Sequence, residues 1–221
     1  MAVVDSRYKF VLIDVGAEGR QSDPGVLKAS AIGHHMESGS LDLPGMSLLP
    51  GTRIAAPHVF IGDEAFQLRP DFLRPYPARE LTSEKRIFNF RLSSARNCVE
   101  NAFGILAARW RILLQTMNLD PGHAENVVKA TCILHNFLME HFQLPEAYGD
   151  EVDCLGNVAD GTWRTEVQGI QLDSLAPTHA RNHSRTAVVC RETFTKYFCS
   201  RAGAVTYQWA KAGCSAPDWS S

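Results

Sequence analysis

Three acidic residues have the clearest capacity for chemistry in this 221-residue chain. Asp23 follows a glycine-rich turn, Asp63 follows a short apolar run, and Glu100 lies among arginines in a strongly amphipathic stretch. Carboxylate oxygens suit Mg²⁺ and Mn²⁺, and two such ions about 4 Å apart can promote phosphodiester cleavage. Most acidic residues are nevertheless solvated surface charges, and Asp23 could instead be the N-cap of a helix with Pro24 at its first position.

The acids are expected to be positioned by a strand and a helix. Residues 58–66, HVFIGDEAF, are typical of a buried strand that enters a loop at its Gly-Asp pair. Residues 92–115 predict a helix whose apolar stripe is formed by Val99, Phe103, Leu106, Trp110 and Leu113. Residues 2–16 predict two strands joined by a turn, and residues 124–142 predict a second core helix in which His135 is a buried core side chain.

Charge is distributed unevenly along the chain. The totals are 22 Lys and Arg against 24 Asp and Glu, which excludes a uniformly basic protein that coats nucleic acid. Residues 79–111 hold seven basic and three acidic side chains, which indicates either a phosphate-binding face or a solvated helix face. Residues 140–175 hold eight acidic side chains and one arginine, which predicts a flexible acidic linker. The predicted organisation is a domain over 1–142, a linker over 143–183, and a C-terminal helix and tail over 184–221.

Four ordered segments resemble one known family. They are DVGAEGRQSDPGVLKAS, HVFIGDEAFQLRPDFLRPY, FNFRLSSARNCVENAFGILAARWRIL and ATCILHNFL. Together they resemble the DDE superfamily endonuclease domain of PIF/Harbinger-type, transposase-derived nucleases. The later segment CRETFTKYFCSRAGAVTYQW is similar to the closing helix of that family.

The resemblance implies a fold, an activity and a set of site residues. The implied fold is α/β, an RNase H-like mixed sheet flanked by helices. The implied activity is DNA strand cleavage with Mg²⁺ or Mn²⁺, in the nucleus or else the cytoplasm, with a separate DNA-binding protein as a possible partner and no membrane association. Asp63 and Glu100 take the catalytic positions and bind metal together with Asp23, and Arg96 and Arg111 contact DNA phosphates.

The sequence departs from the family pattern at its start. The family has a further catalytic aspartate upstream, in an Asp-Gly-x-His-like motif on the first strand of the sheet, and no such motif precedes Asp5. We therefore expect the fold to lack its first strand and the metal site to lack one ligand. Two hypotheses stay open: a nuclease domain, or a catalytically inactive relic that binds metal, nucleic acid or protein. For residues 1–221 alone the expectation is little nuclease activity.

Overall fold

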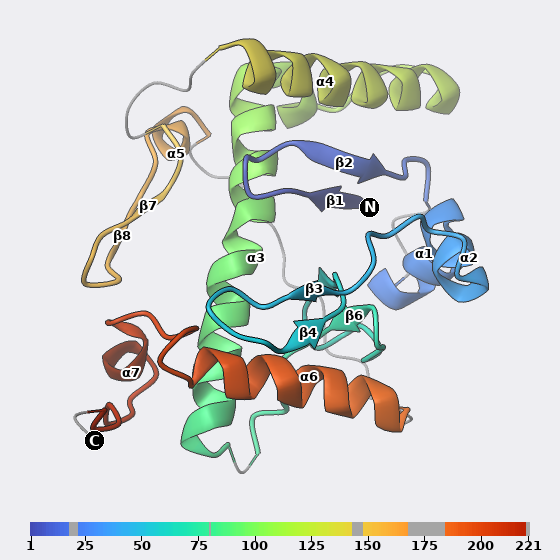
Figure 1. Ribbon diagram of the computed structural model, residues 1–221. Coiled ribbons are helices and arrows are strands. Elements are labelled where there is room, and N and C mark those ends of the chain that lie inside the picture. Colours follow the sequence, from blue (N-terminus) through green and yellow to red (C-terminus); the bar gives the residue numbers. More distant parts are fainter. Residues whose placement is uncertain (18–21, 80, 143–147, 168–183, 220–221) are drawn as a thin grey trace. The chain divides into compact units, whose positions relative to one another are not determined.

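The computed structural model describes residues 1–17, 22–79, 81–142, 148–167 and 184–219, with the backbone alone for Asp23. These residues include helices and four two-stranded sheets, which confirms the predicted α/β class at that coarse level (Figure 1). The chain divides into two compact units. Unit 1 comprises residues 1–40, 97–153 and 157–174, and unit 2 comprises residues 41–96, 154–156 and 175–221.

Within the described ranges, no helix has both the length and the apolar character that a bilayer crossing requires.

Unit 1 begins with the predicted hairpin. Strands β1 (Ala2–Val4) and β2 (Phe10–Ile13) pair antiparallel, and a bulge lies between Val3 and Val4. The Asp5 carboxylate fixes the turn, because it accepts hydrogen bonds from the backbone N–H groups of Arg7 and Lys9. Two short helices, α1 (Asp23–Ala29) and α2 (Ala31–Ser38), follow. Ser22 is the N-cap of α1, so Asp23 is the first helical residue and the prediction that it is the cap was wrong.

The hairpin is joined to helix α4 (Pro121–His141). The bounds of this helix are close to the predicted 124–142. Asn136 donates to and accepts from the backbone of Phe10, both at 2.8 Å, and His135 Nε2 lies 2.7 Å from the carbonyl oxygen of Tyr8. Phe10 also packs edge-on against the His135 ring. The His-Asn pair of the ILHN segment is therefore a structural tie between α4 and the hairpin, and His135 is fully buried as predicted.

His135 gives the fold a pH dependence that can be measured. Burial lowers the pKa of His135 from its ordinary value of 6.5, and the buried Nδ1 atom has no described hydrogen-bond partner. Below about pH 6.5 the unfolded chain therefore binds the proton more readily than the folded chain, so stability should fall as the pH drops from 7 to 5. Denaturant unfolding should show this fall, and His135→Gln, which retains a donor near the Nε2 position, should flatten it. The control is His123→Gln, which changes an exposed residue of the same helix and should leave the pH dependence as steep as in the wild type. If stability fell equally with pH in all three proteins, His135 would not be the source of the pH dependence.

Helix α3 (Ser83–Arg109) begins earlier and ends earlier than the predicted 92–115. Its start is displaced because Ile87 and Phe88 are fully buried and extend the apolar surface toward the N-terminus. Its end is displaced because the backbone leaves the helical region at Trp110 and continues as the 3₁₀ helix η1 (Arg111–Leu114). Of the predicted stripe Leu106 is buried, whereas Val99, Phe103 and Trp110 are half-buried.

The C-terminal half of α3 is covered on two sides within unit 1. Its buried residues therefore extend beyond the single apolar stripe that the sequence predicts. Ala102 and Leu106 pack with Phe10 of the hairpin. Ile105 and Ala108 pack with Tyr148 and Trp163, which come from the predicted acidic linker.

The described part of that acidic segment is folded. Residues 148–167 form strands β7 (Glu151–Val152) and β8 (Val158–Ala159) and the short helix α5 (Trp163–Glu166), with Trp163 buried. The sequence predicts a flexible linker here, and the structure differs over these residues in one respect: the buried aromatic ring of Trp163 gives the acidic segment an apolar contact with α3. Residues 143–147 and 168–183 of the predicted linker lie outside the described residues, and the three-part division of the chain stays a prediction.

Unit 2 contains the remaining sheets and two C-terminal helices. Strands β3 (Ser47–Leu48) and β4 (Ala55–Ala56) pair antiparallel, and β5 (Phe60–Ile61) and β6 (Phe72–Leu73) pair parallel. Helices α6 (Arg185–Phe198) and α7 (Gln208–Lys211) follow. The core of unit 2 joins β6, the first half of α3 and α6, and consists of Leu68, Leu73, Tyr76, Phe88, Leu92, Ala187 and Cys190.

Candidate active site

Asp63 lies where the sequence predicts it, directly after a strand. Backbone hydrogen bonds from Phe60 to Asp71 and from Gly62 to Leu73 pair this end of β5 with β6. Gly62 must be glycine for close packing, because a Cβ atom there would lie 2.6 Å from the Phe72 ring. The Asp63 Oδ1 atom accepts a hydrogen bond of 2.9 Å from the N–H of Ala65, which fixes the direction of the half-buried carboxylate.

A buried arginine holds the loop that follows Asp63. Arg74 donates hydrogen bonds to the carbonyl oxygens of Glu64 and Phe66, at 3.0 and 2.9 Å. Burial lowers the pKa of Arg74 from its ordinary value. The loop that presents Asp63 is therefore anchored by a side chain that directly follows β6, a role that no local sequence pattern indicated.

Glu100 lies on α3 with its side chain exposed, as the helical period predicts. Arg96 is one helical turn earlier, so the two side chains share a face of the helix. Arg111 is exposed but lies in η1, beyond the end of α3, so its predicted place on the same helix was wrong. Glu100 belongs to unit 1 and Asp63 to unit 2, and their convergence stays a prediction. The side chain of Asp23 lies outside the described residues.

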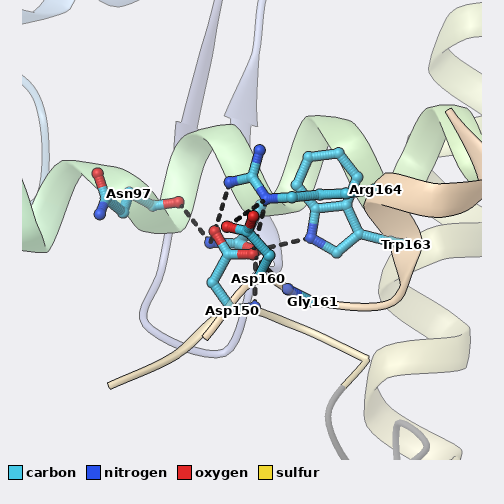
Figure 2. Close-up of polar contacts among 7 residues, drawn as sticks. Asn97, Asp150, Asp160, Gly161, Trp163 and Arg164 are labelled. Carbon is cyan, nitrogen blue, oxygen red and sulfur yellow. Dashed lines mark hydrogen bonds and ion pairs between the residues drawn. The ribbon is translucent and has the colours of Figure 1, made fainter. Parts of the chain in front are cut away.

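The residue after Glu100 organises a buried polar network that the sequence analysis missed (Figure 2). Asn101 is 2% exposed. Its Oδ1 atom accepts hydrogen bonds from the Asp150 backbone N–H at 3.0 Å and from Trp163 Nε1 at 2.9 Å. Its Nδ2 atom donates to the carbonyl oxygen of Asn97 at 3.0 Å and to Asp150 Oδ2 at 3.2 Å. Segment 148–167 is thereby attached to the helical turn that carries Glu100.

Asp150 and Arg164 complete this network. Arg164 donates through Nε to Asp150 Oδ1 at 3.0 Å and through a terminal nitrogen to Oδ2 at 2.5 Å, and Gly161 N–H also donates to Oδ1. Burial alone would raise the pKa of Asp150, but these hydrogen bonds outweigh it and hold the pKa below its ordinary value. The Asp150 carboxylate raises the pKa of Arg164, and the Glu100 carboxylate contributes in the same direction. A fixed cation is therefore part of the electrostatic environment of Glu100.

The close approach of segment 148–167 to α3 depends on Gly104. A Cβ atom at this position would lie 2.1 Å from the Trp163 ring. The glycine of the AFG segment thus allows the indole to pack directly on the helix, beside the turn that carries Asn101. The one sequence signal for this contact was a tryptophan in an otherwise acidic and polar stretch.

The candidate ligands fit a hard divalent cation by their chemistry. Asp63 and Glu100 offer carboxylate oxygens, and Mg²⁺ typically takes only one or two protein carboxylates together with phosphate oxygens. In the part of the chain that the structure describes, no group of three or more His, Cys, Asp or Glu side chains is arranged to hold a metal ion.

Comparison with known proteins gives two findings. Residues 1–136 match the model of a family described as DDE superfamily endonuclease, and this range includes Asp63, Glu100 and the His-Asn pair of α4. The chain is also 31% identical over 140 residues to "Protein ALP1-like" of Arabidopsis thaliana, which covers 63% of this chain and 34% of the relative. The chain thus spans about a third of the length of this curated relative. No solved structure matches the chain.

Proposed function

Because this chain belongs to the DDE superfamily endonuclease family, we propose that it carries a metal-dependent nuclease domain that cleaves phosphodiester bonds of DNA. The observation that carries the proposal is that the family match extends over both motif acids, Asp63 after its strand and Glu100 on the exposed side of α3. We further propose an RNase H-like arrangement of the complete domain and a location in the nucleus.

In this proposal Asp63, Glu100 and Asp23 hold divalent cations, which when bound would activate a water molecule and stabilise the leaving oxygen. The hydrogen bond from Ala65 fixes the direction of the Asp63 carboxylate. The network at Asn101 holds the turn of α3 that presents Glu100. Positioning and charge stabilisation supply most of the catalysis in phosphoryl transfer, so rigid attachment of both acids serves the reaction directly.

The proposal is tested by incubating purified 1–221 with supercoiled plasmid in Mg²⁺, in Mn²⁺ and in EDTA. Nicking that requires the metal supports the nuclease. Because little cleavage is expected of residues 1–221 alone, the assay is repeated with a chain extended upstream by the family's first strand. DNA binding without cleavage by both proteins would support the alternative, a catalytically inactive binding module. The same assay with and without a candidate DNA-binding protein would test the proposed partner.

We propose that Arg96 and Arg111 contact DNA phosphates. Each phosphate contact contributes about 0.9 to the slope of log affinity against log salt. Replacing both arginines by Glu should therefore weaken DNA binding and reduce that slope by about 2. Fluorescence anisotropy from about 50 to 200 mM salt measures both quantities. Arg53→Glu and Arg201→Glu, which change exposed arginines elsewhere, are the matched controls; an equal effect in the controls would show that only net charge matters.

A further inference from the structure

Helix α4 has apolar side chains on two opposite faces. One face packs into unit 1 through Cys132 and Val128, with the buried His135 beside them against the hairpin. The opposite face carries Ile133, Leu134 and Phe137, which are 66%, 50% and 54% exposed. A helix that is apolar on opposite sides is typical of a helix buried on both sides. The inner face is covered by the hairpin and by α3, whereas the three outer side chains stay exposed among the residues that the structure describes.

The outer face is a continuous surface. At 100° per residue, seven exposed positions of α4 fall within an arc of about 100° on the helix surface. One is His123 in the first turn, and we call the other six the outer stripe; they are Asn126, Ala130, Ile133, Leu134, Phe137 and His141. The Phe137 and His141 rings contact each other at 4.5 Å between centroids, so the C-terminal end of the stripe is already packed.

The order of residues in the outer stripe is self-complementary. Positions 126, 130 and 133 lie as far before the midpoint of the stripe as positions 141, 137 and 134 lie after it. In an antiparallel pair of these helices, the polar Asn126 therefore meets the polar His141, and the small Ala130 meets the large Phe137. The two central aliphatic side chains meet each other. Polar ends, an apolar centre and small side chains opposite large ones are what a twofold contact between identical surfaces needs.

Charged side chains along one edge of the stripe match in the same arrangement. Lys129 and Glu140 lie on the same side of the stripe, about 90° and 70° from its centre. Their side chains are 44% and 52% exposed, so each keeps open surface beside its partner within the chain, Glu125 or Lys9. In an antiparallel pair related by a twofold axis, the edge of one stripe that carries Lys129 and Glu140 lies beside the same edge of the other copy. Position 129 of one copy and position 140 of the other then lie about 3 Å apart along the helix axis. Two Lys129–Glu140 pairs can therefore form between the copies.

We propose that the outer stripe of α4 is a homodimer interface, in which a second copy of this chain packs its own α4 antiparallel across a twofold axis near Ile133 and Leu134. The central contact is apolar, a hydrogen bond between the Asn126 amide and the His141 imidazole closes each end, and the Lys129–Glu140 pairs border one edge. This assembly goes beyond the proposed nuclease function and does not depend on catalytic activity.

The first test measures the oligomeric state of 1–221 by sedimentation over a range of concentrations. The wild-type chain should dimerise. Ile133→Glu places a carboxylate in the apolar centre twice per dimer and should raise the dissociation constant at least about a hundredfold. The matched control is Leu48→Glu, because Leu48 is 62% exposed in unit 2 and lies outside the stripe. A chain that stays monomeric at every concentration, or a dimer that Ile133→Glu does not weaken, would overturn the proposal.

The second test examines the antiparallel order by exchanging charges. Lys129→Glu places two acids beside each other at both ends of the interface and should weaken the dimer about five- to tenfold. Adding Glu140→Lys to the same chain should restore the affinity, because each pair of opposite charge is formed again in reversed order. Sedimentation at low salt measures both changes.

The rescue can only arise between copies. The two positions are 11 residues apart on one helix, about 16 Å at 1.5 Å per residue. Within the chain, Lys129→Glu places a second acid beside Glu125 and Glu140→Lys places a second base beside Lys9, so the intrachain pairs are lost rather than restored. Failure of the rescue, in a dimer that Ile133→Glu still disrupts, would overturn the antiparallel arrangement.

Discussion

Replacing Asp63 by Asn, in 1–221 or in a version extended upstream by the family's first strand, is expected to lower whatever metal-dependent DNA cleavage that protein shows by at least about a hundredfold, which corresponds to about 2.7 kcal/mol of transition-state stabilisation. The amide keeps the size of the side chain and one oxygen atom, and that oxygen can still accept the hydrogen bond from Ala65. It removes the negative charge that holds a divalent cation. Glu100→Gln should have an effect of similar size for the same reason.

The controls are exposed acids outside the proposed site. Asp42→Asn matches Asp63→Asn in unit 2, and Glu37→Gln matches Glu100→Gln in unit 1. Both should cleave DNA at the wild-type rate. If wild-type 1–221 does not cut, the readout becomes Mn²⁺ affinity, which Asp63→Asn and Glu100→Gln should lower and the controls should not. Site variants with unchanged cleavage and unchanged Mn²⁺ affinity would contradict the metal-binding role of these acids.

Trp163→Ala should lower the free energy of unfolding of unit 1 by about 3–5 kcal/mol, the range typical of a large aromatic side chain removed from a core. Trp163 is 7% exposed, packs on Gly104 and donates to the buried Asn101. The substitution leaves a cavity against α3, and the buried Asn101 Oδ1 atom loses the hydrogen bond that Trp163 Nε1 donates. Denaturant unfolding measures the loss, and hydrogen exchange should show faster exchange in residues 97–108.

The control for this prediction is Val158→Ala in the same segment and the same unit, because Val158 is exposed and its truncation should change stability by less than about 0.5 kcal/mol. A Trp163→Ala effect as small as that of the control would mean that segment 148–167 behaves as a loose linker. Such a result would also remove the proposed support for the turn that carries Glu100.

Much of the candidate site followed from local sequence patterns. The apolar run before Gly62 and Asp63 predicted a strand that ends in a loop, and the helical period placed Glu100 on an exposed face. Both predictions succeed because strand and helix periodicity depend on residues close together in the sequence. The hairpin of β1 and β2 and the approximate bounds of α4 were also predicted in this way, whereas the family membership followed from the resemblance of four ordered segments to a known family.

Tertiary structure alone decided which residues hold these elements together. Asn101 bonds to Asp150 and Trp163 at sequence separations of 49 and 62, and His135 bonds to the Tyr8 carbonyl at a separation of 127. No local pattern encodes such contacts, and net charge concealed the buried tryptophan in the acidic segment. The two apolar faces of α4 were indistinguishable in the sequence, since each repeats every three to four residues. Only packing against the hairpin shows which face is buried, and leaves the outer stripe exposed.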